Sequence, residues 1–208
     1  MNQKNLLGLN ICFLDLDDPL QLFKAWMDEA EKSEPNDPNA VSLATSNKEN
    51  TPSVRMVLLK DFNANGFIFY TNLNSQKGEE LKENPKAAMC FHWKSLLRQI
   101  RIVGTLKLVD VKTADDYYKT RAYESRIGAW ASKQSSILKS RDELLDSLES
   151  YKNKYNDKDK VPRPDHWSGW NLKPSSIEFW LDGDNRIHER LKYTLDENNN
   201  WVKNLLSP

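Results

Sequence analysis

Two short apolar runs around a tight turn constrain the fold of this chain more than any other stretch. Residues 55–60 (Arg-Met-Val-Leu-Leu-Lys) and 67–71 (Phe-Ile-Phe-Tyr-Thr) are rich in β-branched and aromatic side chains, and Asn65-Gly66 lies between them. An Asn-Gly pair between two such runs is the strongest local signal for a β-hairpin. Antiparallel pairing then predicts that Arg55 and Asn72 face each other at the far end.

That far end collects groups that bind anions. Ser75 is placed to cap a helix through residues 78–84, which Pro85 ends. A helix N-terminus offers free N–H groups and a partial positive charge to a phosphate, and Arg55 and Lys77 add charge-assisted hydrogen bonds. The sequence therefore predicts an anion pocket here. The alternative is that both cations are solvated charges at the ends of a strand and a helix.

The composition favours one cytoplasmic domain that binds neither nucleic acid nor a membrane. A chain of 208 residues with 38% hydrophobic content suits a single core. Its 30 basic residues balance 30 acidic ones, unlike the charge of a nucleic-acid binder. No apolar span suits a membrane helix or a signal peptide. Two cysteines and three histidines without ligand spacing predict a reducing compartment and no bound metal.

Periodicity divides the chain into an N-terminal arm, residues 1–17, and one domain, residues 18–208. The arm has no clear periodicity, and we expect it to be mobile or to lie on a partner. Asp18-Pro19 predicts a helix start, followed by an apolar stripe of Leu22, Phe23, Trp26, Met27 and Ala30. Strands are predicted at 40–45, 87–93 and 98–109. The last alternates around a bend at Gly104, with one face made by Ile100, Ile102, Leu106 and Leu108, which is typical of an antiparallel sheet.

A helix after the third of these strands carries a second group of polar side chains. Thr113 and Asp116 predict a capping box at its start. Tyr117 and Arg121 then lie four residues apart, and Ser125 falls on the same side if the helix continues. This stripe offers a phenol, a guanidinium and a hydroxyl to one ligand, the alternative being an ordinary amphipathic rim.

The C-terminal part predicts an antiparallel meander. A surface helix that Ser140 caps and a linker at 156–165 precede it, and its strands are expected at 177–181, 186–195 and 201–206. In the middle strand Arg186, His188 and Arg190 alternate, so all three are expected on one face. Repulsion along this row is relieved if an anion or an electron-rich ligand meets it, or if the row is fully solvated.

Taken together, these motifs resemble the pyridoxamine 5'-phosphate oxidase family of flavin enzymes from about residue 18 onward. The matching stretches are 55–60, 69–72 with Ser75 and Lys77, 98–104, Ser125 with 127–132 and 134–135, 178–180 and 185–190. The resemblance implies a mostly β (α+β) fold, an antiparallel FMN-binding split β-barrel with flanking helices. It also implies a homodimer with FMN at the subunit interface.

The resemblance also implies roles for individual residues. One subunit would hold FMN through Arg55, Tyr70, Thr71, Lys77 and Gln99, and the other through Gln134, Ser135, Trp180 and Arg190. Further cofactor-binding residues would be Met56, Val57, Leu58 and Gln76. The substrate phosphate would be held by Lys60, Tyr117, Arg121 and Ser125. Arg186 and His188 would lie next to the substrate's pyridine ring as binding and catalytic residues.

The implied reaction makes pyridoxal 5'-phosphate, in vitamin B6 metabolism, from pyridoxamine or pyridoxine 5'-phosphate. A hydride passes from the C4' carbon to the flavin N5, and O2 takes the electrons to give H2O2; Arg186 would orient the substrate. One alternative is a binding protein of the same fold that holds FMN or pyridoxal phosphate with weak or no oxidase activity. Another is a different flavin reductase of the split-barrel group.

The sequence departs from the family pattern in four places. Residues 1–17 contain no Arg or Tyr, although the family carries both in a segment that covers the substrate. Gln76 stands where a second basic group is common, Ala122 and Arg126 replace a Pro and a Gln, and residues 204–208 alter the usual ending. These departures bear on lid closure, FMN affinity and rate, and they remove no residue assigned to hydride transfer.

Overall fold

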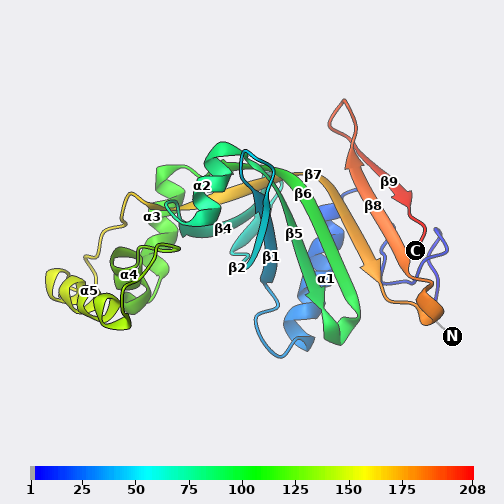
Figure 1. Ribbon diagram of the computed structural model, residues 1–208. Coiled ribbons are helices and arrows are strands. Elements are labelled where there is room, and N and C mark those ends of the chain that lie inside the picture. Colours follow the sequence, from blue (N-terminus) through cyan, green and yellow to red (C-terminus); the bar gives the residue numbers. More distant parts are fainter. Residues whose placement is uncertain (1–2) are drawn as a thin grey trace.

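The computed structural model describes residues 3–208, and most of its strands and helices follow the predicted order (Figure 1). Its strands are β1 (Ala40–Ser46), β2 (Pro52–Leu58), β3 (Asp61–Asn63), β4 (Gly66–Asn72), β5 (Lys86–Trp93), β6 (Arg98–Leu108), β7 (Trp167–Leu181), β8 (Glu189–Leu195) and β9 (Trp201–Leu205). Its helices are α1 (Pro19–Ser33), α2 (Gln76–Glu83), α3 (Val111–Thr120), α4 (Tyr123–Ala131) and α5 (Arg141–Lys154). Within the described residues, no helix has the length and apolar character needed to cross a membrane.

The nine strands of the described residues form one antiparallel sheet, which is the predicted split barrel. Seven follow the order β2-β1-β5-β6-β7-β4-β3, and β8 and β9 extend from β7, β8 pairing with β7 and β9 with β8. The long strand β7 has two successive partners besides β6: its first part pairs with β4 and its last part pairs with β8. The β6–β7 register shifts at Val103/Gly104, which confirms the bend at Gly104. The alternation of β6 continues past this shift, with Ile100, Ile102 and Leu106 buried, and Leu108 at the end of the strand is exposed.

Helix α1 closes the core against the sheet. Asp18 caps it as predicted, and its carboxylate accepts a hydrogen bond from the N–H of Leu20 at 2.9 Å. The predicted stripe is buried, namely Leu22, Phe23, Trp26, Met27 and Ala30. Phe23 meets the ring of Phe91 at 5.4 Å, and each such buried side chain contributes about 1.5–3 kcal/mol. This packing fixes α1 on one face of the sheet, and on the opposite face of β6 the side chains of Arg101, Val103, Thr105 and Lys107 are exposed.

The predicted hairpin is present only at its tip. β3 and β4 pair around the turn at Asn65-Gly66, but β2 pairs along its whole length with β1. Arg55 therefore lies opposite Leu43, and the prediction that it faces Asn72 is wrong. On one edge β4 pairs with β7, and on the other edge β3 pairs only with Gly66–Ile68. Residues 55–58 instead continue the antiparallel pairing of β2 with β1, which begins at Ser46 and Pro52.

The N-terminal arm lies on its own chain, contrary to the prediction of a mobile or partner-bound segment. Its first two residues lie outside the described range. Phe13 is fully buried in the core, and the carbonyl of Leu16 accepts a hydrogen bond from the hydroxyl of Tyr193 at 2.8 Å. Lys4 forms an ion pair with Glu189 at the start of β8. One buried aromatic ring and these tertiary contacts order a segment that has no periodicity of its own.

Two helices replace the single one predicted after Thr113. Asp110, not Thr113, caps α3, because its carboxylate accepts a hydrogen bond from the N–H of Thr113 at 2.8 Å. The chain leaves the helix after Thr120 and starts α4 at Tyr123. Ser140 caps the surface helix α5 as predicted.

The C-terminal meander differs from the prediction at its first strand and its first turn. β7 starts at Trp167, well before the predicted start at 177. The prediction missed residues 167–176 because Gly169 and Pro174 interrupt the alternating pattern that indicates a strand. Arg186 lies in a short turn with a φ of +67°, and only Arg190 of the predicted row is on a strand. The row of three basic residues on one strand face is therefore wrong.

Candidate active site

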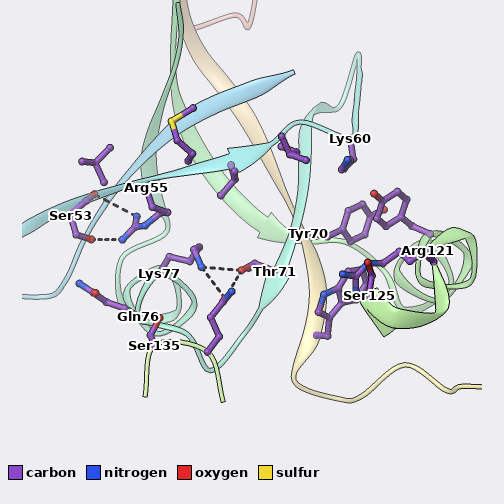
Figure 2. A pocket seen from close by; sticks show the side chains of 18 residues that line it. Ser53, Arg55, Lys60, Tyr70, Thr71, Gln76, Lys77, Arg121, Ser125 and Ser135 are labelled. Carbon is purple, nitrogen blue, oxygen red and sulfur yellow. Dashed lines mark hydrogen bonds between the residues drawn. The ribbon is translucent and has the colours of Figure 1, made fainter. Parts of the chain in front are cut away.

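A cleft of about 750 Å³ opens between β2, β4, the start of α2 and the junction of α3 with α4 (Figure 2). Most of the residues predicted to bind cofactor or substrate line it, namely Arg55, Met56, Val57, Leu58, Lys60, Tyr70, Thr71, Gln76, Lys77, Tyr117, Arg121, Ser125, Gln134 and Ser135. Four of these side chains are cationic, and among the described residues that line the cleft none is acidic. The cleft therefore favours a ligand with negative charge.

Arg55 and Lys77 form one cationic end of the cleft. The ammonium of Lys77 is almost fully buried and donates hydrogen bonds to the hydroxyl of Thr71 and to Oε1 of Gln134, each at 3.1 Å. Burial, and then the charge of Arg55, lower the pKa of Lys77. Ser75 caps α2 as predicted, so an anion here meets two cations beside a helix N-terminus.

Lys60, Arg121 and Ser125 form a second end, on the other side of Tyr70 (Figure 2). The guanidinium of Arg121 lies 4.7 Å from the ring centre of Trp167, and its Nη1 is buried without a hydrogen-bond partner. Burial lowers the pKa of Arg121, but a guanidinium stays charged at neutral pH. A buried, charged donor that lacks an acceptor is a ready site for an anion.

A stack of three aromatic rings forms the wall beside this second end. Tyr70 lies 3.9 Å from Tyr117 at an interplanar angle of 12°, and 5.2 Å from Trp167 at 8°. Burial, followed by the neighbouring Tyr117, raises the pKa of Tyr70 to about 12, so its phenol stays protonated. Sequence reasoning missed four residues that line the cleft, namely Ser53, Val54, Ala122 and Trp167. For Trp167 the usable signal was the pair of tryptophans, Trp167 and Trp170, near the start of β7.

The remaining predicted site residues form a second group at the far end of β7. Gln99, Trp180 and Arg190 are direct neighbours across β6, β7 and β8, so their side chains share one face of the sheet. The ring of His188 lies 4.7 Å from that of Trp180, and its Nδ1 is 3.0 Å from a carboxylate oxygen of Asp182. Arg190 is held by two hydrogen bonds, of 3.0 and 2.7 Å, to the buried Glu178 of β7.

This second group lies far from the cleft of its own chain. A strand rises about 3.3 Å per residue, so roughly 40 Å of β7 separate Trp180 from Trp167 at the cleft. Figure 1 shows β7 running from the α3 side of the molecule to the turn before β8. Arg186 and His188, in that turn, do not line the cleft.

The predicted division of the FMN ligands between subunits is wrong in part. Gln134 and Ser135 were expected to act with Trp180 from the opposite subunit, but they line the same cleft as Lys77. Gln99 was expected to act with Lys77, but it lies beside Trp180. The reason is that the loop after α4 returns to the start of α2, whereas β6 carries Gln99 to the other end of the sheet.

Comparisons of the sequence with protein families and with individual proteins all identify the same family. Residues 27–155 match the family described as "Pyridoxamine 5'-phosphate oxidase", and residues 167–208 match "Pyridoxine 5'-phosphate oxidase C-terminal dimerisation region". The protein named pyridoxine/pyridoxamine 5'-phosphate oxidase of Pelagibacter ubique (strain HTCC1062) is 71% identical over 208 residues, which is 100% of both chains. The protein of the same name from Rhizobium leguminosarum bv. trifolii (strain WSM2304) is 54% identical over 181 residues, 87% of each chain.

Two solved structures share the fold. PhzG from Burkholderia lata 383, in complex with tetrahydrophenazine-1-carboxylic acid, has a TM-score of 0.88 at 28% identity and covers 95% of this chain and 96% of its own. A pyridoxamine 5'-phosphate oxidase-related, FMN-binding protein from Nostoc punctiforme PCC 73102 has a TM-score of 0.73 and covers 92% of this chain and 98% of its own. At 15% identity, the second shows likeness of fold alone.

Proposed function

This chain belongs to the pyridoxamine 5'-phosphate oxidase family of oxidoreductases, and from that premise we propose that it uses FMN to oxidise pyridoxamine and pyridoxine 5'-phosphate to pyridoxal 5'-phosphate, with O2 as the acceptor and H2O2 as the second product. The observation that carries the proposal is a single cleft with two separate cationic ends. Cofactor and substrate each bring one phosphate, so two anion sites are what this pair of ligands requires.

The residues present fit FMN. Its phosphate would be held by Arg55 and Lys77, because Lys77 is a buried cation that neutral acceptors alone now surround. Thr71 and Gln134, which accept hydrogen bonds from Lys77, would keep that ammonium in place. When bound, FMN supplies the hydride acceptor, and the chain supplies binding and orientation.

The second end fits the phosphate of the substrate. Arg121 offers its unpartnered Nη1, and Lys60 and Ser125 line the same region. A guanidinium binds phosphate in a planar, directional way, so it would fix the position of the whole substrate and thereby of its C4' carbon. The stacked ring of Trp167 holds Arg121 in that orientation.

Arg186 and His188 would reach the reacting carbon only from a second subunit. His188 Nδ1 accepts a hydrogen bond from the N–H of Gly183 at 3.2 Å, and among the described residues Nε2 has no hydrogen-bond partner, so Nε2 would be the nitrogen that faces a ligand. An imidazole fixed in this way can hold a substrate oxygen or nitrogen in one direction. We therefore propose a homodimer in which each cleft receives the second group of the other chain.

The surface of β2 supports such a dimer. Val54 and Met56 are 69% and 61% exposed on this edge strand, and both also line the cleft. Apolar side chains this exposed mark a contact surface when they are contiguous with a binding site. The match of residues 167–208 to a family described as a C-terminal dimerisation region supports a second contact on β7, β8 and β9.

Subunit complementation tests the shared site. Lys77→Met and Arg190→Ala are each expected to remove most activity, because each damages both sites of its homodimer. After the two inactive variants are unfolded and refolded together, half of the dimers are mixed, and each of these has one intact site, so about a quarter of wild-type activity should return. If the mixture stays as inactive as either variant, the site is not shared.

The oxidase itself is tested by flavin colour and peroxide release. The purified protein should be yellow, lose that colour anaerobically with pyridoxamine 5'-phosphate, and release one H2O2 per product in air. A binding protein of the same fold would take up the vitamer and release no peroxide. A different flavin reductase would be bleached by reduced nicotinamide and not by the vitamers, and either result would refute the proposal.

A further inference from the structure

A buried carboxylate lies behind the cationic end that Arg55 and Lys77 form, and the geometry points to Glu80 as the positioning residue of that end. The inference rests on the proposed binding of FMN. Glu80 is 6% exposed and lies on α2 one turn after Gln76. It is not part of the cleft lining. Because a negative charge beside an anion site weakens binding by repulsion, its presence there requires a compensating role.

Glu80 receives hydrogen bonds from three elements of the fold. The hydroxyl of Ser53 on β2 lies 2.8 and 2.7 Å from its two oxygens, and Nε2 of Gln76 on α2 donates at 2.9 Å. The hydroxyl of Thr45 on β1 also donates to it, and Nη2 of Arg55 lies at 3.3 Å. Burial opposes ionisation of Glu80, but these hydrogen bonds and the charge of Arg55 hold its pKa below the usual value.

Three of the groups tied to Glu80 are themselves part of the cleft lining, namely Ser53, Arg55 and Gln76. Without the carboxylate, Arg55 keeps acceptors in the carbonyl of Leu43 and the hydroxyls of Thr45 and Ser53, but Nη2 loses its charged partner, and both hydroxyls lose the carboxylate to which they donate. A long side chain that is ordered only when the ligand arrives lowers affinity, whereas one that is ordered beforehand does not. Glu80 therefore orders this end before a phosphate enters.

The same contact explains Gln76. Its Nε2 donates a hydrogen bond to Oε1 of Glu80 at 2.9 Å, so this uncharged side chain belongs to the same network. This cationic end of the cleft thus holds two cations and one carboxylate. Its affinity for a phosphate depends more on the positions of Arg55 and Lys77 than on the total charge. The opposite reading is that Glu80 competes with the phosphate for Arg55, and it predicts an effect of opposite sign.

Glu80→Gln in the full chain, stripped of flavin, separates these readings. FMN and riboflavin share one ring system, and only FMN has the phosphate, so the ratio of their dissociation constants reports on this end. Quenching of flavin fluorescence should show FMN binding about tenfold weaker in Glu80→Gln, with riboflavin changed by less than about twofold. Loss of general stability would weaken both flavins alike and leave the ratio unchanged.

Two further variants complete the test. Glu79→Gln changes the preceding residue, which is exposed and paired with Lys82, and it should leave both constants unchanged. Ser53→Ala removes the hydroxyl that bridges Arg55 and Glu80 and keeps the charge of both, so it should weaken FMN binding about threefold. It serves as the test if Glu80→Gln fails to fold. An unchanged ratio, or tighter FMN binding, in the Glu80 or Ser53 variant overturns the inference alone. A wild-type protein that binds no FMN refutes the proposed function and the inference together.

Discussion

Replacing Lys77 with methionine is expected to weaken FMN binding by roughly 10- to 100-fold while the fold persists. Methionine has nearly the same length and suits the buried position, so the change removes the charge and the donors and leaves little cavity. A hydrogen bond to a charged group contributes about 1.5–3 kcal/mol, and each 1.4 kcal/mol is a factor of ten in affinity. Fluorescence titration of the flavin-free protein measures the effect.

The matched control is Lys82→Met on the same helix. Lys82 is exposed and pairs with Glu79 at 2.8 Å, so its loss should change FMN affinity by less than about twofold. Comparable weakening in both variants would mean that the net charge of α2, and not the position of Lys77, attracts the cofactor. Unchanged binding in Lys77→Met would remove Lys77 from the site.

The pKa of Lys77 adds a dependence on pH with a definite sign. Burial and Arg55 lower this pKa in the free cleft, and a bound phosphate raises it again by its negative charge. FMN binding is therefore strongest while Lys77 is protonated, and it weakens as the pH rises through the lowered pKa, earlier than an ordinary lysine would allow. Titrations between about pH 7 and pH 10 should show this decline in the wild type and not in Lys77→Met.

Local sequence signals predicted the parts of the site that depend on near neighbours in the chain. Ser75 caps α2 and Ser140 caps α5 because a cap needs only the backbone three residues onward. The partner of Arg55 could not be predicted in this way, since β2 pairs with β1 and not with β4 across the Asn65-Gly66 turn, a choice that local signals do not show. The resemblance to a family, not periodicity, grouped Lys60 with Arg121.

Non-local contacts also explain what was missed. Glu80 stands next to Glu79 in a charged helix, and nothing in that stretch distinguishes the buried carboxylate from the exposed one. Apart from Gln76 one turn earlier, the partners of Glu80 come from β1 and β2, which approach α2 in the folded chain. Similarly, the turn that carries His188 takes its shape from positive φ angles at Asn185 and Arg186, which an alternating strand pattern does not show.

Replacing Arg121 with leucine is expected to raise the KM for pyridoxamine 5'-phosphate by about 100-fold, with a smaller change in kcat. Nη1 of Arg121 is the buried donor without a partner at the substrate end, so the variant loses one or two charge-assisted bonds to the phosphate. Arg121→Lys should recover only part of the loss, because an ammonium cannot form the planar pair of bonds. FMN affinity should stay unchanged, since Arg55 and Lys77 hold the other end.

Pyridoxamine without its phosphate provides the decisive comparison for Arg121. If Arg121 binds the phosphate, wild type and Arg121→Leu should differ strongly with the phosphorylated substrate and only slightly with the free vitamer. Lys119→Met, on an exposed position of α3 next to Asp116, is the control and should match the wild type with both substrates. Arg121 also packs on Trp167, so an equal loss with both substrates would mean that the variant disturbs the aromatic wall, and the assignment of Arg121 to the phosphate would be wrong.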